Sequence, residues 1–188
     1  ASMTMPRWSH TAALLLNGSV LVTGGQHGTK IRSSTEVFDP TSNSWTVTGE
    51  MAVGCTQHTA TKLPDGTILV GGGTDGTRTL ETTEIFDPLR QSWSHRPSLG
   101  EARRGHTATN LSDGRVLFVG GRKGSVSLMS VEAYDPQTRG WSQMAPMETP
   151  RRGHTTTLLP NGRVLAAGGG ATVSVNSSEV YDPSGNVW

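Results

Sequence analysis

The sequence contains very little cysteine: Cys55 is the only one among 188 residues. A single thiol excludes an intrachain disulfide and any metal site built from several thiolates. One cysteine suits a reducing compartment and an oxidising compartment equally well, so the sequence leaves the compartment undetermined.

Long hydrophobic runs and an excess of one charge sign are also missing. No apolar stretch approaches the ~20 residues that a membrane-spanning helix needs, and no secretory signal opens the chain. The chain has 16 basic and 15 acidic residues, which gives a formal net charge of +1. We therefore expect neither a membrane nor a nucleic acid as partner, because no overall field attracts an anionic surface.

Helical periodicity is absent too, whereas turn-forming residues are abundant. The chain has 24 glycines, 10 prolines and short apolar runs, a composition typical of an all-β protein with many tight turns. Its length is that of one domain with a substantial core.

One pattern recurs every 48 residues and organises the whole chain. Each copy begins with a His-Thr pair, passes through a Gly-Gly pair, reaches a Glu-x-aromatic-Asp-Pro segment and ends at a tryptophan. The histidines that open the copies are His10, His58, His106 and His154. A strict internal period of this length indicates a repeat architecture.

The second copy illustrates the expected strands. Residues 58–63 and 67–70 predict two strands joined by a tight turn at Pro64-Asp65-Gly66. Residues 83–86 predict a third strand, which Asp87-Pro88 ends, and residues 92–94 begin a fourth. Four antiparallel strands per repeat describe a propeller blade.

The double glycine, the later glutamate, the aromatic residue and the tryptophan together resemble the kelch repeat. The wording "HTATKLPDGTILVGGG" is most similar to kelch domains related to galactose oxidase, and the resemblance covers essentially the whole chain. It implies an all-β, kelch-type β-propeller with four blades of four antiparallel strands, but not one particular activity. The repeats span residues 8–55, 56–103, 104–151 and 152–188, the last together with residues 1–7.

The repeat is interrupted at the chain ends. Trp188 is the last residue, whereas the other copies continue beyond their tryptophan, and residues 1–10 align with residues 145–154. We expect residues 1–7 to complete blade four, either within the chain or in a second copy, because such completion removes open sheet edges. Three arrangements follow: a four-bladed ring of one chain, an eight-bladed ring of two chains joined at their Trp188 and Ala1 ends, or a fragment of a larger propeller.

Most recurrent polar residues are expected to be structural. The four histidines could hold a metal near the axis, but a repeated hydrogen bond to a neighbouring blade is the favoured interpretation. The repeated glutamates are expected to hold loop amides or a repeated polar group rather than to act as acid–base catalysts: Glu36, Glu84, Glu132 and Glu179. We predict no metal and no cofactor.

The resemblance to galactose oxidase suggests a copper-radical enzyme as one function to consider. Such an enzyme needs tyrosines at the metal, one of them joined to a cysteine. Tyr134 and Tyr181 occupy the repeated aromatic position, and Cys55 has no evident tyrosine partner. Residues 71–76 match G-x-G-x-x-G, but a strand follows where a dinucleotide site needs a helix. We predict a non-catalytic module; the alternative is a fragment of a larger propeller or of a galactose-oxidase-like domain that lacks the copper site.

One face of the propeller is predicted to be basic. The loop after the second strand and the link between blades emerge on the same face, which gathers ten of the sixteen basic residues, Lys30 and Arg32 among them. The candidate ligand-binding residues are Arg7, Trp8, Arg78, Arg103, Arg104, Arg122, Lys123, Arg151 and Arg152. Because arginine binds carboxylates bidentately, we predict a protein or acidic peptide as the partner of this face. We also predict that the module self-assembles, either in addition to binding such a partner or in place of it.

Two alternatives accompany this face. For the arginines, the favoured interpretation is a solvated rim paired with glutamates of neighbouring loops. Trp8 either stacks on a ligand or packs at the junction with blade four, and packing is the favoured interpretation.

Overall fold

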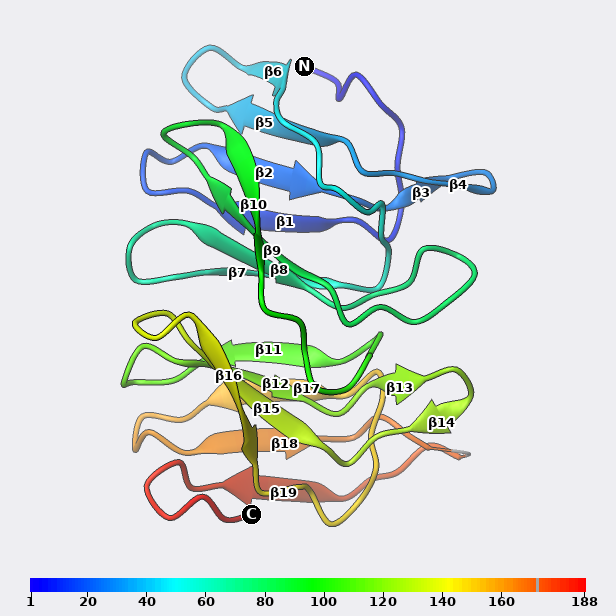
Figure 1. Cartoon of the computed structure of the whole chain (residues 1–188), viewed down its shortest axis with the longest axis vertical. Helices are drawn as coiled ribbons and strands as arrows, with labels where there is room; N and C mark the ends of the chain where they lie inside the picture. The colour runs from blue at the N-terminus through cyan, green and yellow to red at the C-terminus, as the bar shows by residue number, and fades with distance from the viewer. Residues whose placement is uncertain (172) are drawn as a thin grey trace.

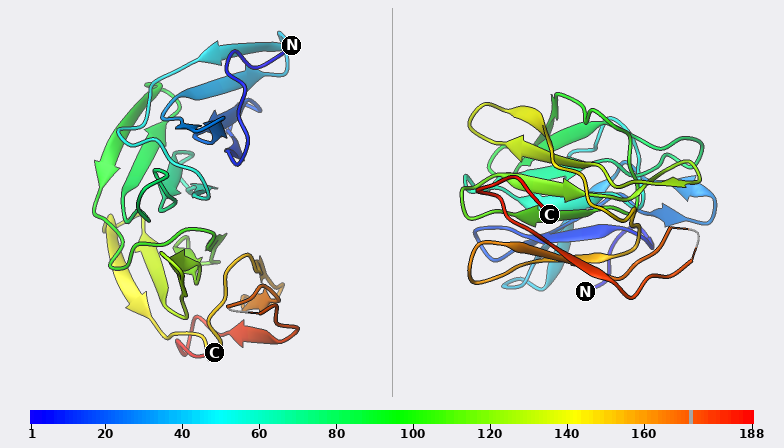
Figure 2. Two further views of the ribbon diagram at one scale, coloured as in Figure 1. Left: turned by 90° about the vertical axis from the view of Figure 1, so that its right-hand side faces the viewer. Right: turned by 90° about the horizontal axis from the view of Figure 1, so that it is seen from below.

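The computed structural model describes residues 1–171 and 173–188, and every regular element among them is a β-strand. Three sheets have four antiparallel strands each, ordered from the inside of an arc to its outside (Figures 1 and 2). Blade one contains β1 (Thr11–Leu14), β2 (Val20–Thr23), β5 (Thr35–Asp39) and β6 (Ser44–Val47). Blade two contains β7 (Thr59–Lys62), β8 (Ile68–Gly71), β9 (Thr83–Asp87) and β10 (Ser92–Arg96). Blade three contains β11 (Thr107–Asn110), β12 (Val116–Val119), β15 (Val131–Asp135) and β16 (Gly140–Met144).

The fourth blade has three strands, β17 (Thr155–Leu158), β18 (Val164–Ala167) and β19 (Ser178–Tyr181). Two short hairpins extend the loops after the second strands of blades one and three. They pair β3 (Gln26–His27) with β4 (Lys30–Ile31), and β13 (Arg122–Lys123) with β14 (Val126–Ser127). The predicted all-β fold of antiparallel blades is thus confirmed.

The turns have the chemistry that the sequence predicted. Gly66 has a φ of 85°, which a side chain would strain, and Asp65 accepts a hydrogen bond from the Thr67 amide at 3.0 Å. Between the third and fourth strands, Asp135 accepts a hydrogen bond from the Gln137 amide at 2.8 Å. These aspartates line one edge of the arc, which we call the turn face; the hairpins and blade links lie on the opposite edge, the loop face (Figure 1).

Apolar side chains fill the joints between successive blades. Leu21, Leu69 and Leu117, from the second strands of blades one to three, are wholly buried, and each packs in the joint to the following blade. The repeated tryptophans close the same joints. Trp93 and Trp141 donate hydrogen bonds from Nε1 to the carbonyls of Gly49 at 3.0 Å and Pro97 at 2.8 Å, in the preceding links.

Residues 1–7 do not complete blade four within the chain, so that expectation is wrong. Thr4 donates its amide to Glu36 of blade one at 2.7 Å. The Ala1 amino group lies 3.4 Å from Asn43 Oδ1 of blade one. The Ala145 amide makes the equivalent contact in blade four, where it donates a hydrogen bond to Asn186 Oδ1 at 2.9 Å. The physical reason is the register: residues 1–7 match the link after a fourth strand, not the strand itself.

The single chain is consequently an open crescent rather than a four-bladed ring. Its N- and C-termini lie at opposite ends of the arc (Figure 2). Completion of the last blade by another copy stays a prediction.

Candidate functional site

Three of the nine candidate residues lie in the interior. Arg7, Arg103 and Arg151 are buried, so they cannot belong to an exposed basic face as the sequence analysis expected. Each forms an ion pair with the glutamate of its own blade: Arg7–Glu36 at 2.7 Å, Arg103–Glu132 at 2.6 Å and Arg151–Glu179 at 3.0 Å.

Each of these arginines also ties together the loops around it. Arg103 donates from Nη1 to the carbonyls of Gly120 at 2.8 Å and Ser130 at 3.1 Å. Glu132 in turn accepts the Gly100 amide at 2.6 Å, which joins the link to the third strand of the blade. The repeated glutamates therefore hold link amides and a repeated cation, in keeping with their expected structural role.

Blade two departs from this arrangement. Cys55 occupies the position of the buried arginine, and Glu84 accepts only the Ala52 amide, at 3.0 and 3.2 Å, among the described contacts. Burial, with a smaller contribution from the Glu84 charge, raises the pKa of Cys55 to about 12. The thiol is therefore held protonated and buried, unlike a reactive cysteine.

The repeated histidines fasten neighbouring blades. His58 Nε2 lies 2.8 Å from Thr11 Oγ1, His106 Nε2 lies 3.0 Å from Thr59 Oγ1, and His154 Nε2 lies 3.1 Å from Thr107 Oγ1. Each contact joins a histidine to the first threonine of the preceding blade, which confirms the favoured interpretation. Within residues 1–171 and 173–188, no group of three or more histidine, cysteine, aspartate or glutamate residues has a geometry that could hold a metal ion.

The copper-radical arrangement is likewise not assembled. Tyr134 and Tyr181 are wholly buried and pack against Trp141 and Trp188, with ring centroids 5.2 and 5.1 Å apart. Cys55 packs in the joint of blades one and two, whereas the tyrosines pack in the later joints. Both tyrosines are thus structural, as expected from their repeat position.

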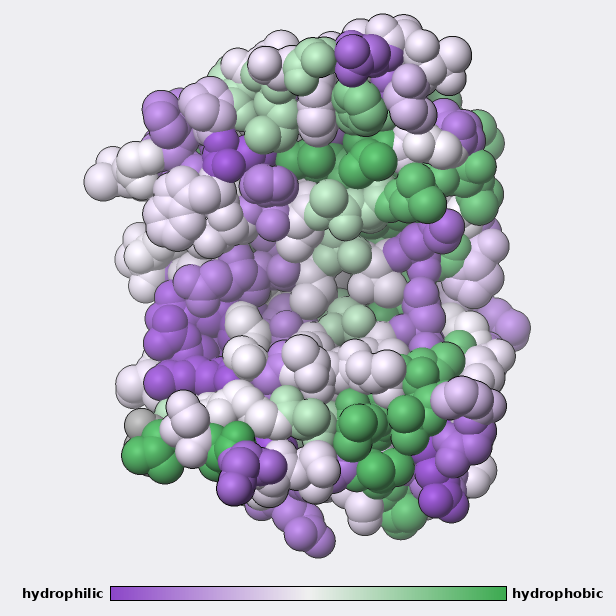
Figure 3. All heavy atoms as spheres, turned by 180° about the vertical axis from the view of Figure 1, so that it is seen from behind, coloured by the Kyte–Doolittle hydropathy of each residue, from purple (hydrophilic) through white to green (hydrophobic). Residues whose placement is uncertain are grey.

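Three other candidate arginines come together on the loop face. Arg104, Arg122 and Arg152 line a shallow recess of about 390 Å³ with Gln57 and the backbone of Gly105 and Gly153. We call this group the arginine rim. The view onto the concave side shows hydrophilic side chains gathered along the loop edge near the middle of the arc (Figure 3).

Backbone pairing positions the arginine rim. Arg104 and Arg122 exchange both amide-to-carbonyl hydrogen bonds, at 3.0 and 2.9 Å, which places the two residues side by side. Gly153 donates its amide to Gly105 at 3.1 Å, and Gly105 donates to Gln57 at 3.0 Å. This second series of hydrogen bonds holds the link that precedes blade four, which contains Arg152, against the link that precedes blade three.

The arginine rim is electrostatically unbalanced. Partial burial, and then the charges of Arg104 and Arg152, lower the pKa of Arg122. No carboxylate among the described residues forms an ion pair with Arg104, Arg122 or Arg152. Three neighbouring like charges repel one another, and a bound anion would relieve that repulsion.

The remaining candidates lie outside this recess. Arg78 pairs with Asp75 of its own loop at 3.1 Å, and Lys123 is exposed in the β13–β14 hairpin. Trp8 occupies the repeat position of Arg104 but is 57% exposed and pairs through its backbone with Gln26. In the single chain it therefore does not pack at a junction with blade four, contrary to the favoured interpretation.

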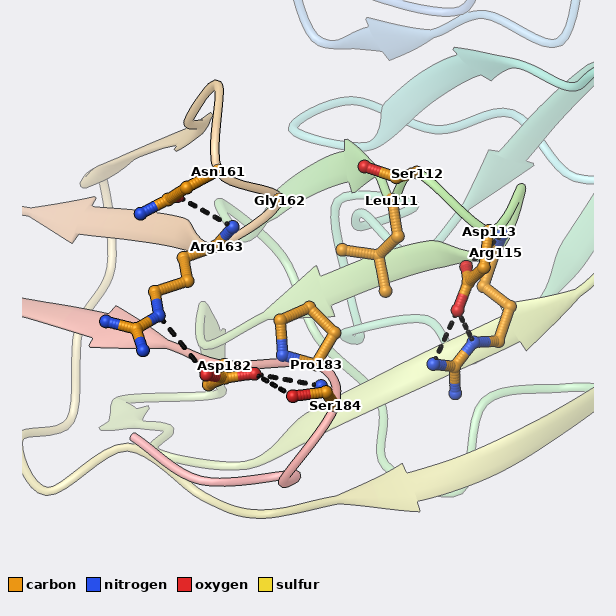
Figure 4. Close-up of a pocket in the computed structure, with 10 residues that line it drawn as sticks. All are labelled: Leu111, Ser112, Asp113, Arg115, Asn161, Gly162, Arg163, Asp182, Pro183 and Ser184. Carbon is orange, nitrogen blue, oxygen red and sulfur yellow. Dashed lines mark hydrogen bonds and ion pairs between the residues drawn. The ribbon is translucent and has the colours of Figure 1, made fainter.

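A larger pocket, of about 680 Å³, lies on the turn face between blades three and four (Figure 4). Its charges are already paired: Arg115 with Asp113 at 2.7 Å, and Arg163 with Asp182 at 3.2 Å. The rest of its lining consists of Leu111, Ser112, Asn161, Gly162, Pro183 and Ser184. A similar pocket of about 500 Å³ lies between blades one and two, so these grooves are features of the blade joints.

Sequence reasoning missed Gln57, Gly105 and Gly153 as lining residues of the arginine rim. The available signal was their common repeat position, immediately before the histidine, where Gln57, Gly105 and Gly153 have φ values of 57°, 60° and 61°.

No helix among the described residues is long and apolar enough to cross a membrane. None of the curated proteins compared matches the chain at a significant level. Among solved structures, that of YjhT superposes with a TM-score of 0.75 and 20% sequence identity, over 87% of this chain and 59% of that one. This chain thus spans less than two thirds of that structure's length, and the likeness shows the propeller fold alone. The model of the KLHDC2/KLHL20/DRC7 Kelch-repeats domain matches residues 9–188, and the chain therefore belongs to the kelch-repeat family.

Proposed function

We propose that this domain is a non-catalytic protein-interaction scaffold that binds an acidic segment of its partner at the arginine rim. Kelch-repeat domains typically serve as protein-interaction scaffolds, which supports the general role. The observation that carries the specific proposal is the convergence of Arg104, Arg122 and Arg152 without an ion-paired carboxylate among the described residues.

The chemistry of the recess fits carboxylates on a peptide. Guanidinium groups donate paired hydrogen bonds to a carboxylate, and such charge-assisted bonds are stronger than neutral ones. Gln57 adds a neutral amide that can bind peptide backbone, and the recess is shallow enough for an extended segment rather than a small molecule. Trp8, exposed on the same face of blade one, offers an apolar surface for a neighbouring side chain.

The test uses fluorescence anisotropy with a labelled hexaglutamate peptide at low ionic strength. The double variant Arg104→Glu/Arg152→Glu should weaken binding at least about 100-fold, because it replaces two attractive charges with repulsive ones. The control is Arg90→Glu, which reverses an exposed charge on the turn face.

Arg103 and Arg151 are unsuitable for this test because reversing a buried charge would unfold the blade. Two outcomes would contradict the proposal: equal binding by the rim double variant and the native chain, or equal binding of hexaglutamate and hexaglutamine. A loss caused equally by Arg90→Glu would show a non-specific charge effect and would also contradict it.

A further inference from the structure

The turn-face pocket between blades one and two is lined differently from its counterpart between blades three and four. In the latter pocket, Ser112 and Ser184 contribute hydroxyl groups (Figure 4). Leu16 lies at the repeat position of Ser112, and Leu89 lies at that of Ser184, directly after an Asp-Pro pair. We call the pocket between blades one and two, of about 500 Å³, the leucine groove.

The leucine groove presents apolar surface that no other part of the described chain covers. Leu89 is 95% exposed, although blade two has a neighbouring blade on each side. Leu16 leans over Gly66 of blade two and is 74% exposed. Single exposed leucines are ordinary, but these two adjoin the buried Leu15 and Ile85 in one pocket and form a continuous apolar lining.

A tyrosine hydroxyl without a partner lies beside the leucine groove. A small adjoining pocket of about 80 Å³ shares Arg96 and Arg139 with the groove and reaches Tyr134. Tyr134 is wholly buried, yet its hydroxyl has no hydrogen-bond partner among the described residues. The equivalent Tyr181 hydroxyl donates to Asn186 Oδ1 at 2.8 Å, and Arg139 is the residue at the Asn186 position in blade three. An arginine therefore replaces the group that would satisfy this hydroxyl from within the chain.

Unpaired positive charge accompanies the hydroxyl. Arg96 and Arg139 form no ion pair with a carboxylate among the described residues, and the Nε of Arg96 is buried without a hydrogen-bond partner. Burial raises the pKa of Tyr134, and the nearby Arg96 guanidinium lowers it in part. The small pocket thus gathers a hydroxyl, a guanidinium Nε and a second guanidinium, which are the donors that suit a carboxylate.

The carboxylates of the chain that line the groove are already engaged. Asp65 accepts hydrogen bonds from the amide and the hydroxyl of Thr67, at 3.0 and 2.7 Å. Asp87 pairs with Arg90 at 2.6 Å. The charge left without a partner in the groove is therefore positive.

We propose that the leucine groove binds a segment of a partner protein in which a large apolar side chain lies beside a carboxylate. The apolar side chain packs against Leu16 and Leu89, and the carboxylate pairs with Arg96 and Arg139 and gives the Tyr134 hydroxyl its acceptor. A protein segment fits better than a small molecule, because Leu89 is almost fully exposed and only a surface that extends beyond the pocket can cover it. The groove lies on the face opposite the arginine rim, so this inference is independent of binding at the rim.

A displayed library of random nonapeptides, selected on the native chain, tests the proposal. Counter-selection on Leu16→Ser/Leu89→Ser removes peptides that bind elsewhere, and this variant keeps the fold because serine occupies both positions in the pocket of blades three and four. We expect the enriched peptides to place Phe, Trp, Leu or Met within two positions of Asp or Glu. They should bind the serine variant at least about 10-fold more weakly, because apolar contact is lost.

Two outcomes of the selection would overturn the proposal. One is that no peptide is enriched on the native chain over the serine variant. The other is that the enriched peptides lack carboxylates or lack a large apolar side chain.

Arg139→Asn tests the polar end of the groove by fluorescence anisotropy with a labelled selected peptide. It supplies the residue that accepts the tyrosine hydroxyl in blade four, so the chain should stay folded while binding weakens at least about 10-fold. The matched control Lys123→Asn removes an exposed cation from the loop face and should leave binding unchanged. Native binding by Arg139→Asn, or an equal loss in Lys123→Asn, would contradict the proposal.

Competition with 4-phenylbutyrate separates a protein segment from a small organic acid as the occupant. This molecule carries an apolar ring and a carboxylate but no peptide backbone. We expect it to displace the labelled peptide only at concentrations at least about 100-fold above those of the unlabelled peptide, because it covers less of the exposed leucines. Equal competition would identify a small-acid pocket and overturn the assignment of a protein segment.

Discussion

At the scale of single residues, the buried arginine–glutamate pairs connect links, loops and strands. Arg151 shows how many groups meet at one side chain: it donates to the carbonyls of Gly168 and Ser177, both at 2.8 Å, and to Glu179. A buried ion pair contributes little net stability, but removing one partner strands the other charge in the interior. These pairs therefore serve to hold the links in one conformation.

Replacing one such arginine should be severely destabilising. Arg103→Met leaves Glu132 buried without its cation, and we expect a loss of about 3–5 kcal/mol in the free energy of unfolding. Urea denaturation followed by tryptophan fluorescence measures this loss. Arg90→Met, which removes an exposed pair with Asp87, should leave the urea midpoint almost unchanged. Similar losses in both variants would show that the buried pairs have no special structural role.

The buried histidines should make the fold sensitive to mild acid. Burial is the main cause that lowers the pKa of His58 and of His154 to about 4, from an ordinary value of 6.5; the Arg151 charge adds to it at His154, and a backbone hydrogen bond at Thr23 partly opposes it at His58. Between these values the unfolded chain binds protons that the folded chain does not, so the stability present in full above pH 6.5 is lost as the pH falls towards 4. Each histidine accounts for about 3 kcal/mol over this window.

Measuring the unfolding free energy from pH 7 to pH 4.5 tests this expectation. The slope against pH should decrease in His58→Gln, because one fewer proton is taken up on unfolding, whatever the variant's absolute stability. His27→Gln changes an exposed histidine and should keep the native slope. A flat native profile would contradict the assignment of the histidines as buried and neutral.

Sequence reasoning predicted the structural role of some repeated residues and missed others for one reason. The histidines, the glutamates and the tryptophans recur in every copy, and recurrence marked them as parts of the blade. Arginine recurs in three copies out of four, at Arg7, Arg103 and Arg151. Because of its charge, its side chain was predicted to be exposed at the surface. The presence of Cys55 in the remaining copy concealed the pattern. Arg104, Arg122 and Arg152 could be placed on the loop face from sequence, whereas their convergence depends on how neighbouring links pair.

At the scale of strands and sheets, the position of a blade in the arc decides how much a repeated residue contributes. The second strand of every blade carries a leucine at the same repeat position. The side chains of β12 are nevertheless buried on both faces of the strand, whereas those of β18 are buried on one face only. The strand periodicity predicted which side chains face a neighbouring blade. It could not predict which end blade lacks a neighbour, because that depends on the arrangement of whole repeats.

Two equivalent leucines measure this difference. Leu117→Ala creates a cavity in a closed joint and should cost about 3–5 kcal/mol in unfolding free energy. Leu165→Ala, at the same repeat position on the open face of blade four, should cost about 1 kcal/mol in the monomer, because solvent already reaches the site. Chemical denaturation at concentrations below self-association measures both. Equal losses would contradict the open face of blade four.

At the scale of the whole molecule, the chain is an arc of four blades whose two ends differ. The sequence correctly predicted an all-β, kelch-type fold of antiparallel strands, whereas the fourth strand that it predicted for blade four is not found among the described residues. It did not predict that residues 1–7 serve as the link of blade one, because a link and an outer strand are neighbours in every repeat. The contacts of Thr4 and Ala1 with blade one resolve that ambiguity.

The likeness of the three joints also has a consequence for how such a chain can change over generations. A duplication or deletion of 48 residues, begun at any point of the repeat, leaves every internal blade with a neighbour of the right shape on each side. The arc can therefore lengthen or shorten without new contacts having to arise. Blade two is the exception: its link has Cys55 in place of the arginine, so each duplication of it would multiply a copy in which the buried glutamate lacks its cation.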